Sequence, residues 1–136
     1  MSEVLILKKR KDFVRVAAKG VKVATSTLIL QAAQSLSSPA RDVLEDGCYL
    51  GFTATKKLGK AHVRNRVKRR LRAAAAECFV AGGRPGTDYV LIGRYNTAVV
   101  DFAKLKSDMA RALLDINSQM DSQGAQRNET PDDRAD

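Results

Sequence analysis

The sequence lacks the residue sets on which most enzyme active sites depend. His62 is its only histidine, so neither a His-based catalytic triad nor a multi-histidine metal site can be assembled. Cys48 and Cys78 form no CxxC pattern and no zinc spacing, and we expect them to be buried free thiols. The acidic residues are scattered, and neither GxxxxGK[ST] nor GxGxxG is present. The sequence therefore predicts no catalytic residue, no metal site and no small-molecule substrate, and it disfavours an autonomous hydrolase.

Long apolar runs are also missing. No stretch approaches the about 20 apolar residues that a membrane-spanning helix needs. The N-terminal residues, MSEVLILKKRK, place their positive charges after a very short apolar stretch, whereas a signal peptide has the reverse order. We therefore expect a cytoplasmic protein that has no membrane partner.

Size and composition predict one domain with a basic surface. The 136 residues are 44% hydrophobic but only 5% aromatic, so the core should be aliphatic and rich in alanine. The formal net charge is +9. Residues 118–136 hold two Arg and five acidic residues, which leaves 22 basic and 10 acidic residues, a balance of +12, in residues 1–117. We expect 1–117 to be a single RNA-binding domain and 118–136 to be a disordered, polar and acidic tail.

The most informative segment is 56–72, which reads KKLGKAHVRNRVKRRLR. More than half of its residues are Lys or Arg, and no acidic residue interrupts them. In a helix, Val63, Val67 and Leu71 would form one apolar stripe that Ala74 and Cys78 continue, and the basic residues would cover the other faces. Helices that are merely solvated usually mix Glu with Lys. The pattern therefore favours a nucleic acid as partner, with a solvated basic face, a nuclear-localisation segment or a membrane-surface segment as the alternatives.

Hydrophobic periodicity predicts an α+β fold. We expect a two-layer sandwich in which helices pack on a mainly antiparallel sheet, in the order helix–strands–helix–strand–helix. The basic helix would connect two strands, which are parallel if they are adjacent, and such crossovers are normally right-handed. The predicted elements are a helix at 8–19, one or two strands at 21–34, a strand at 47–56, a helix at 61–80, a strand at 88–95 and a helix at 101–117.

Three segments resemble the protein subunit of bacterial ribonuclease P. They are LKKRKDFVRVAAKG (7–20), GFTATKKLGKAHVRNRVKRRLRAA (51–74) and DYVLIGR (88–94), and the resemblance covers roughly residues 8–117. It implies a fold similar to a domain of some ribosomal proteins, with a left-handed βαβ crossover in place of the common right-handed one. It also implies a ribonucleoprotein in which a large RNA uses Mg²⁺ to cleave the 5′ leader from precursor transfer RNA. The protein would assist that RNA, and the Mg²⁺ would be held mainly by the RNA and the substrate.

The resemblance also implies two sets of binding residues. A cleft between the first helix and the sheet would hold the single-stranded leader of the precursor, and its residues would be Phe13, Ile29, Gln31, Thr53 and Thr55. The contacts to the catalytic RNA would come from the basic helix and the turn before it, through Lys56, Lys57, Lys60, Arg64, Asn65, Arg66, Lys68, Arg69 and Arg72.

Two positions depart from the family pattern. Ala17 and Gln31 stand where cleft aromatics are common, so base stacking on the leader should be weaker here. Phe13 could alternatively be an ordinary core residue. The alternative function is a structural RNA-binding protein, such as a ribosomal component, because the basic helix suits that function equally well.

Overall fold

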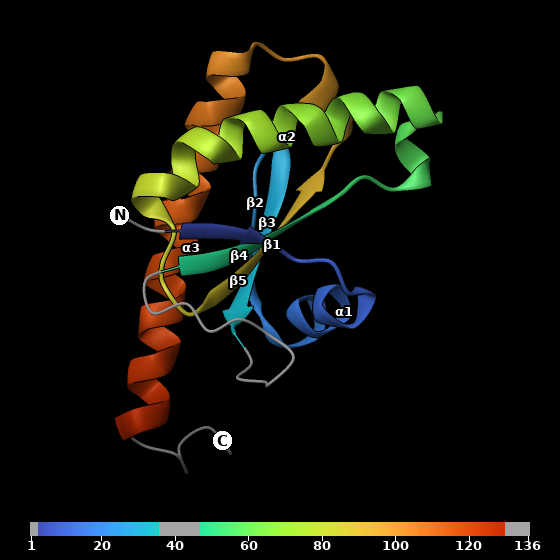
Figure 1. Cartoon of the computed structure of the whole chain (residues 1–136). Coiled ribbons are helices and arrows are strands. Elements are labelled where there is room, and N and C mark those ends of the chain that lie inside the picture. Colours follow the sequence, from blue (N-terminus) through green and yellow to red (C-terminus); the bar gives the residue numbers. More distant parts are fainter. Residues whose placement is uncertain (1–2, 36–46, 130–136) are drawn as a thin grey trace.

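A five-stranded mixed sheet organises the chain (Figure 1). The computed structural model describes residues 3–35 and 47–129. The strands are β1 (Glu3–Ile6), β2 (Val21–Ala24), β3 (Leu28–Gln34), β4 (Gly47–Thr53) and β5 (Thr87–Gly93), and the helices are α1 (Arg10–Lys19), α2 (Ala61–Gly82) and α3 (Phe102–Glu129). Two short 3₁₀ turns, η1 (Lys56–Leu58) and η2 (Tyr95–Ala98), follow β4 and β5. The predicted α+β class and the separation of 21–34 into two strands are confirmed.

The strand order across the sheet is β1-β4-β5-β3-β2. β4 pairs with β5 in parallel, so α2 is the crossover between two adjacent parallel strands. β3 pairs with both β5 and β2 in antiparallel. The sheet is evenly mixed, whereas the sequence predicted a mainly antiparallel one, because β1 adds a second parallel pair with β4. The sequence did not predict β1, because the strand has only four residues and its partner, Gly47–Leu50, is distant in the sequence.

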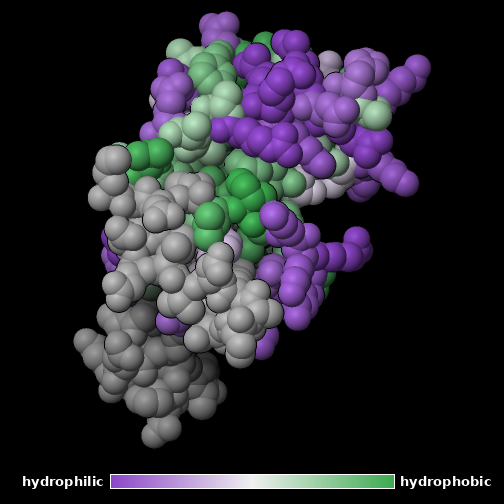
Figure 2. Space-filling view, in the orientation of Figure 1, coloured by the Kyte–Doolittle hydropathy of each residue, from purple (hydrophilic) through white to green (hydrophobic). Residues whose placement is uncertain are grey.

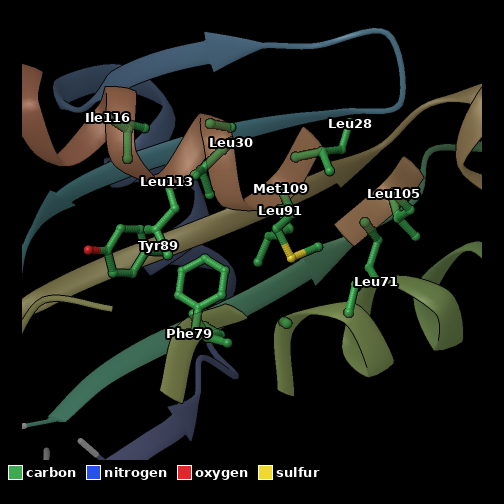
Figure 3. Close-up of a cluster of buried hydrophobic side chains, with 14 of the residues drawn as sticks. Leu28, Leu30, Leu71, Phe79, Tyr89, Leu91, Leu105, Met109, Leu113 and Ile116 are labelled. Atoms are coloured by element: carbon green, nitrogen blue, oxygen red, sulfur yellow. The ribbon is translucent and has the colours of Figure 1, made fainter. Parts of the chain in front are cut away.

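The main core lies between one face of the sheet and the helices α2 and α3 (Figure 3). Leu30 and Leu91 from the sheet meet Leu71 of α2 and Met109 of α3, and all four side chains are fully buried. Burial of a side chain of this size contributes about 1.5–3 kcal/mol. The predicted apolar stripe of α2 is confirmed, since Val67, Leu71 and Ala74 are buried and Val63 and Cys78 are partly buried.

Gly93 lets α2 rest directly on β5. A β-carbon at Gly93 would lie 2.1 Å from Cγ1 of Val67, a distance that no packed pair of carbon atoms tolerates. The close approach fixes the N-terminal half of α2 over the carboxyl end of β5. The basic residues of that half therefore have a defined position on the molecule.

α1 lies on the opposite face of the sheet and covers only part of it (Figure 1). Val16 of α1 packs there with Leu7, Ala33 and Val90. The two-layer description holds for the sheet with α2 and α3, and α1 adds a partial third layer. The sheet face beside α1 is the surface on which the predicted cleft residues lie.

α3 is longer than the sequence predicted. The expected disordered tail begins at residue 118, but the helix continues to Glu129. Met120 packs against the main core, and Arg84 forms an ion pair with Asp121, so contacts with the rest of the fold support a segment that is polar in sequence. Residues 130–136 of the predicted tail lie outside the described residues. Within 3–35 and 47–129, no helix is long and apolar enough to cross a bilayer.

Candidate nucleic-acid interface

The N-terminal half of α2 and the turn before it form one positively charged surface, which we call the basic surface. In Figure 2 it is the hydrophilic region that covers α2. Six of its side chains are exposed cations, and none of these is in a salt bridge within the described part of the chain. They are Lys56, Lys57, Lys60, Arg66, Arg69 and Arg72. Asn65 is also exposed, and Arg64 and Lys68 are partly buried, so the structure brings together the whole predicted set for the catalytic RNA.

The turn η1 places three lysines at the start of α2. Leu58 packs against the main core, whereas Lys56, Lys57 and Lys60 remain exposed. Gly59 has φ 134°, a backbone conformation that favours glycine and lets the chain turn into the helix. The first turn of α2 contains no acidic residue, so the positive end of the helix dipole adds to the lysines. This end of α2 is therefore suited to bind phosphate groups.

Several arginines of α2 are held by contacts within the protein. The Nε–H of Arg66 donates a hydrogen bond to the carbonyl oxygen of Ala98 at 3.0 Å. The guanidinium of Arg72 lies 5.7 Å from the ring centroid of Phe52, a cation–π distance. Arg70 was outside the predicted set, and its guanidinium donates to the carbonyl of Val100. These contacts order long side chains before a ligand binds, which lowers the entropy cost of binding.

On the other side of the sheet, the ring of Phe13 lies over Gly51. A β-carbon at Gly51 would be 2.6 Å from Cζ of Phe13, so glycine is what makes room for the ring. Phe13 is only partly buried, although it packs against the small core beneath α1. The ring therefore combines a fixed position with an accessible edge or face, which a base-stacking residue needs.

The predicted cleft residues of the sheet lie in two neighbouring rows that cross the strands. In the first row Thr53 is opposite Ile92, and Ile92 is opposite Ile29. In the second row Gly51, beneath Phe13, is opposite Val90, and Val90 is opposite Gln31. Strands are spaced by about 4.8 Å, so each row spans roughly 10 Å from β4 to β3. We call this surface, together with α1, the α1 face.

Most of the α1 face is accessible. Ile29, Gln31, Thr53 and Ile92 are all partly exposed, because they alternate with residues that point into the main core. Figure 2 shows the molecular surface hollowed between α1 and the α2 side of the molecule. Ile92 was not among the predicted cleft residues, although the alternation of residues 88–93 places it on this face.

Thr55 and Ala17 do not contribute as strand or stacking residues. β4 ends at Thr53, so Thr55 is an exposed residue of the turn and its carbonyl accepts a hydrogen bond from the Leu58 N–H at 3.1 Å. The predicted place of Thr55 on the open strand face is wrong, because the strand ends two residues before it. Ala17 is exposed on α1 and offers no ring, as its identity implies.

A buried ion pair joins α1 to the sheet. Arg15 of α1 pairs with Asp88 of β5, whose side chain is fully buried, and also donates to the carbonyl of Gln34 at 2.9 Å. The hydroxyl of Ser35 donates to Asp88 at 2.7 Å. The pair could not be predicted from the sequence, because Arg15 and Asp88 are 73 residues apart in the chain. The pair holds α1, the helix that carries Phe13, against the sheet.

The two thiols are poor nucleophiles at neutral pH. Burial, aided by the negative charge of Asp88, raises the pKa of the Cys48 thiol to about 11. Burial likewise raises the pKa of Cys78, with Glu77 raising it and Lys106 lowering it. In residues 3–35 and 47–129, no three His, Cys, Asp or Glu side chains are grouped in a way that could hold a metal ion.

Comparison with known proteins gives one consistent result. A family model described as Ribonuclease P matches residues 1–117. The "Ribonuclease P protein component" of Paramagnetospirillum magneticum is 41% identical over 124 residues, which cover 91% of each chain. That of Gluconacetobacter diazotrophicus is 45% identical over 108 residues, 79% of this chain and 86% of the relative.

Solved structures show the same fold. The RNase P protein of Thermotoga maritima superposes with a TM-score of 0.63 at 23% identity, covering 79% of this chain and 93% of that one. The RNase P protein of Staphylococcus aureus gives a TM-score of 0.62 at 24% identity, with 79% and 91% covered.

Proposed function

The chain belongs to the ribonuclease P protein family, and from this premise we propose that its basic surface binds the catalytic RNA while its α1 face holds the 5′ leader of precursor transfer RNA. The chain is a protein component of the ribonucleoprotein that processes transfer RNA, and the enzyme activity belongs to the complex. The alternative of a structural component such as a ribosomal protein is not favoured, because the relatives are ribonuclease P proteins.

The observation that carries the proposal is the continuity of the two surfaces at the end of β4. Thr53 belongs to the α1 face, and Lys56 and Lys57 begin the basic surface three and four residues later. A single strand lying across Phe13 and Thr53 would therefore reach the lysines at the start of α2. The basic surface binds the catalytic RNA in this proposal. When the leader lies on the α1 face, the transfer RNA part of the precursor therefore lies beside the catalytic RNA.

The proposed contribution is binding and charge screening. Cations that contact phosphates release counterions, and they reduce the repulsion between two RNA molecules held side by side. The leader is single-stranded, so its bases are free to stack on Phe13, and the hydroxyl of Thr53 is placed to contact the backbone. The contacts of Phe13 and Thr53 with the leader raise the affinity of the complex for the precursor over the mature product, because the mature product has no leader.

The proposed function assigns Mg²⁺ binding to the RNA molecules and not to the protein. The cations of the basic surface repel a divalent cation, and the amide oxygen of Asn65 alone is too few ligands to hold one, so this surface does not fit a Mg²⁺ site. In this proposal, phosphates of the catalytic RNA and the substrate hold the Mg²⁺, and the protein's own contacts with RNA do not involve the metal ion. The proposed place of action is the cytoplasm, where bacteria transcribe their transfer RNA.

The test is a reconstitution. The 5′ cleavage of a precursor transfer RNA is measured at low Mg²⁺ with the ribonuclease P RNA of the same organism, with and without the protein, and with the protein alone. We expect the protein to stimulate the RNA and to cleave nothing by itself. Absence of stimulation contradicts the proposed function, and cleavage by the protein alone contradicts the assignment of catalysis to the RNA.

A further inference from the structure

Tyr95 is unusual among the aromatic residues of the chain. The chain has four Phe and three Tyr, and Tyr95 is the only one of them that is exposed, with 67% of its surface accessible. It begins η2, the short turn between β5 and α3. A single exposed aromatic needs no explanation by itself. Its surroundings, however, are those of a binding residue.

The turn that carries Tyr95 is fixed at several points. The N–H of Arg94 donates to Oγ1 of Thr97 at 2.9 Å, and that hydroxyl in turn donates to the carbonyl of Thr27. The side-chain amide of Asn96 donates to the carbonyl of Ser26 at 3.1 Å. These bonds tie η2 to the β2–β3 turn, so Tyr95 is presented on a rigid support. A rigid aromatic group loses little conformational entropy on binding.

The same turn is attached to the basic surface. Arg66 donates to the carbonyl of Ala98 at 3.0 Å, and Arg70 donates to that of Val100, so η2 lies directly against α2. Arg94 is exposed beside Tyr95 and has one guanidinium nitrogen 2.9 Å from the carbonyl of Thr25. The carboxylate nearest to Tyr95 along the chain is that of Asp101, six residues away and just before α3. Tyr95 is therefore a fixed aromatic next to Arg94, on a turn that Arg66 and Arg70 of α2 also contact. An aromatic group with cations near it is the chemistry that holds an unpaired nucleotide.

We propose that Tyr95 stacks on an unpaired base of the RNA subunit, with Arg94 and Arg66 contacting the neighbouring phosphates. The inference rests on the proposed function, because it takes the basic surface to be the site of the RNA subunit. The occupant is the RNA subunit and not the precursor, since η2 adjoins α2, whereas the α1 face lies on the opposite side of the sheet. Tyr95 thus extends the RNA interface from α2 across η2.

The experiment measures binding of the full-length protein to the ribonuclease P RNA of the same organism, without substrate. We expect Tyr95→Ala to weaken binding about tenfold, because loss of base–aromatic stacking has an effect of this order. Tyr95→Phe keeps the ring and should bind like the wild type. Val99→Ala is the matched control, because Val99 is 62% exposed in the same connection but carries no ring.

The outcomes separate the inference from the function on which it rests. If the wild type binds the RNA and Tyr95→Ala binds equally well, the inference is wrong and the proposed function stands. If Tyr95→Phe or Val99→Ala loses as much affinity for the RNA as Tyr95→Ala, the loss does not come from stacking on the Tyr95 ring, and the inference is again wrong. If the wild type does not bind the RNA, the proposed function itself fails. Because Tyr95 is exposed, its substitution should not disturb folding. Equal midpoints of urea unfolding for the wild type and the variants check this.

Discussion

The ring of Phe13 lies over Gly51, so close that a β-carbon on Gly51 would be 2.6 Å from its Cζ atom. The contact joins α1 to the middle of the sheet and determines where the aromatic group stands above the α1 face. Glycine at position 51 is therefore part of the proposed leader site, although it has no side chain to offer.

Gly51→Ala should displace the Phe13 ring. Overpacking of this kind costs about 1–3 kcal/mol of stability, and we expect urea unfolding to show a loss in that range. The loss should be much smaller in a Phe13→Ala background, because the ring that opposes the new methyl group is then absent. Equal losses in the two backgrounds would show that the contact does not determine the cost.

Acid should unfold the protein partly through Asp108 of α3. Burial alone would raise the pKa of Asp108, but the hydrogen bonds from Thr27, Lys104 and Arg111, together with the charge of Lys104, outweigh burial and hold the pKa below its usual value. The ionised carboxylate therefore stabilises the fold above the usual pKa of about 3.9, and this stability is lost as the pH falls through the lower folded-state pKa.

Asp108→Asn is the variant that tests this linkage. We expect it to be less stable than the wild type at neutral pH and to lose less stability between pH 5 and the acid limit. The control is Asp115→Asn, an exposed carboxylate on the same helix. Parallel curves of unfolding free energy against pH for the wild type and Asp108→Asn would contradict the assignment.

Arg66→Ala should reduce the activity of the assembled enzyme most at low Mg²⁺. The variant loses one cation from the basic surface, and a higher concentration of Mg²⁺ can replace the lost screening. We expect roughly a tenfold loss at low Mg²⁺, the effect of one charge-assisted hydrogen bond. A variant equal to the wild type at every Mg²⁺ concentration would exclude Arg66 from the interface.

The hydrogen bond from Arg66 to Ala98 gives that experiment a useful control. Arg66→Lys keeps the positive charge but lacks the Nε–H that donates to the carbonyl. If charge screening is the contribution of Arg66, the lysine variant should retain most of the activity at low Mg²⁺. If support of η2 matters more, both variants should lose activity alike.

Local patterns predicted the elements that carry charge or a strong periodicity. The stripe of Val67 and Leu71 identified α2 and its buried face, and the one-signed charge identified the basic surface. The end of α3 could not be predicted, because contacts such as that of Arg84 with Asp121 come from the folded chain and leave no local pattern.

The site was predictable residue by residue only where the sequence itself alternates. The resemblance named Ile29 and Thr53, strand periodicity predicted which residues share a face with each of them, and the pairing of β3 and β4 with β5 places both in one row. The support of the site depends on pairs that are distant in sequence, such as Arg15 with Asp88. Likewise, nothing local to Gly51 shows that it faces an aromatic ring.

The central claim is that the α1 face recognises the precursor through its leader. The most direct measurement compares the affinities of the reconstituted complex for precursor and for mature transfer RNA, with wild-type protein, Phe13→Ala and Val14→Ala. Val14 is the control because it is an exposed neighbour on α1. We predict that Phe13→Ala weakens binding of the precursor about tenfold, leaves binding of the mature product unchanged, and that Val14→Ala changes neither. Equal affinities of the wild type and Phe13→Ala for the precursor, or an equal loss for both RNAs, would contradict the claim.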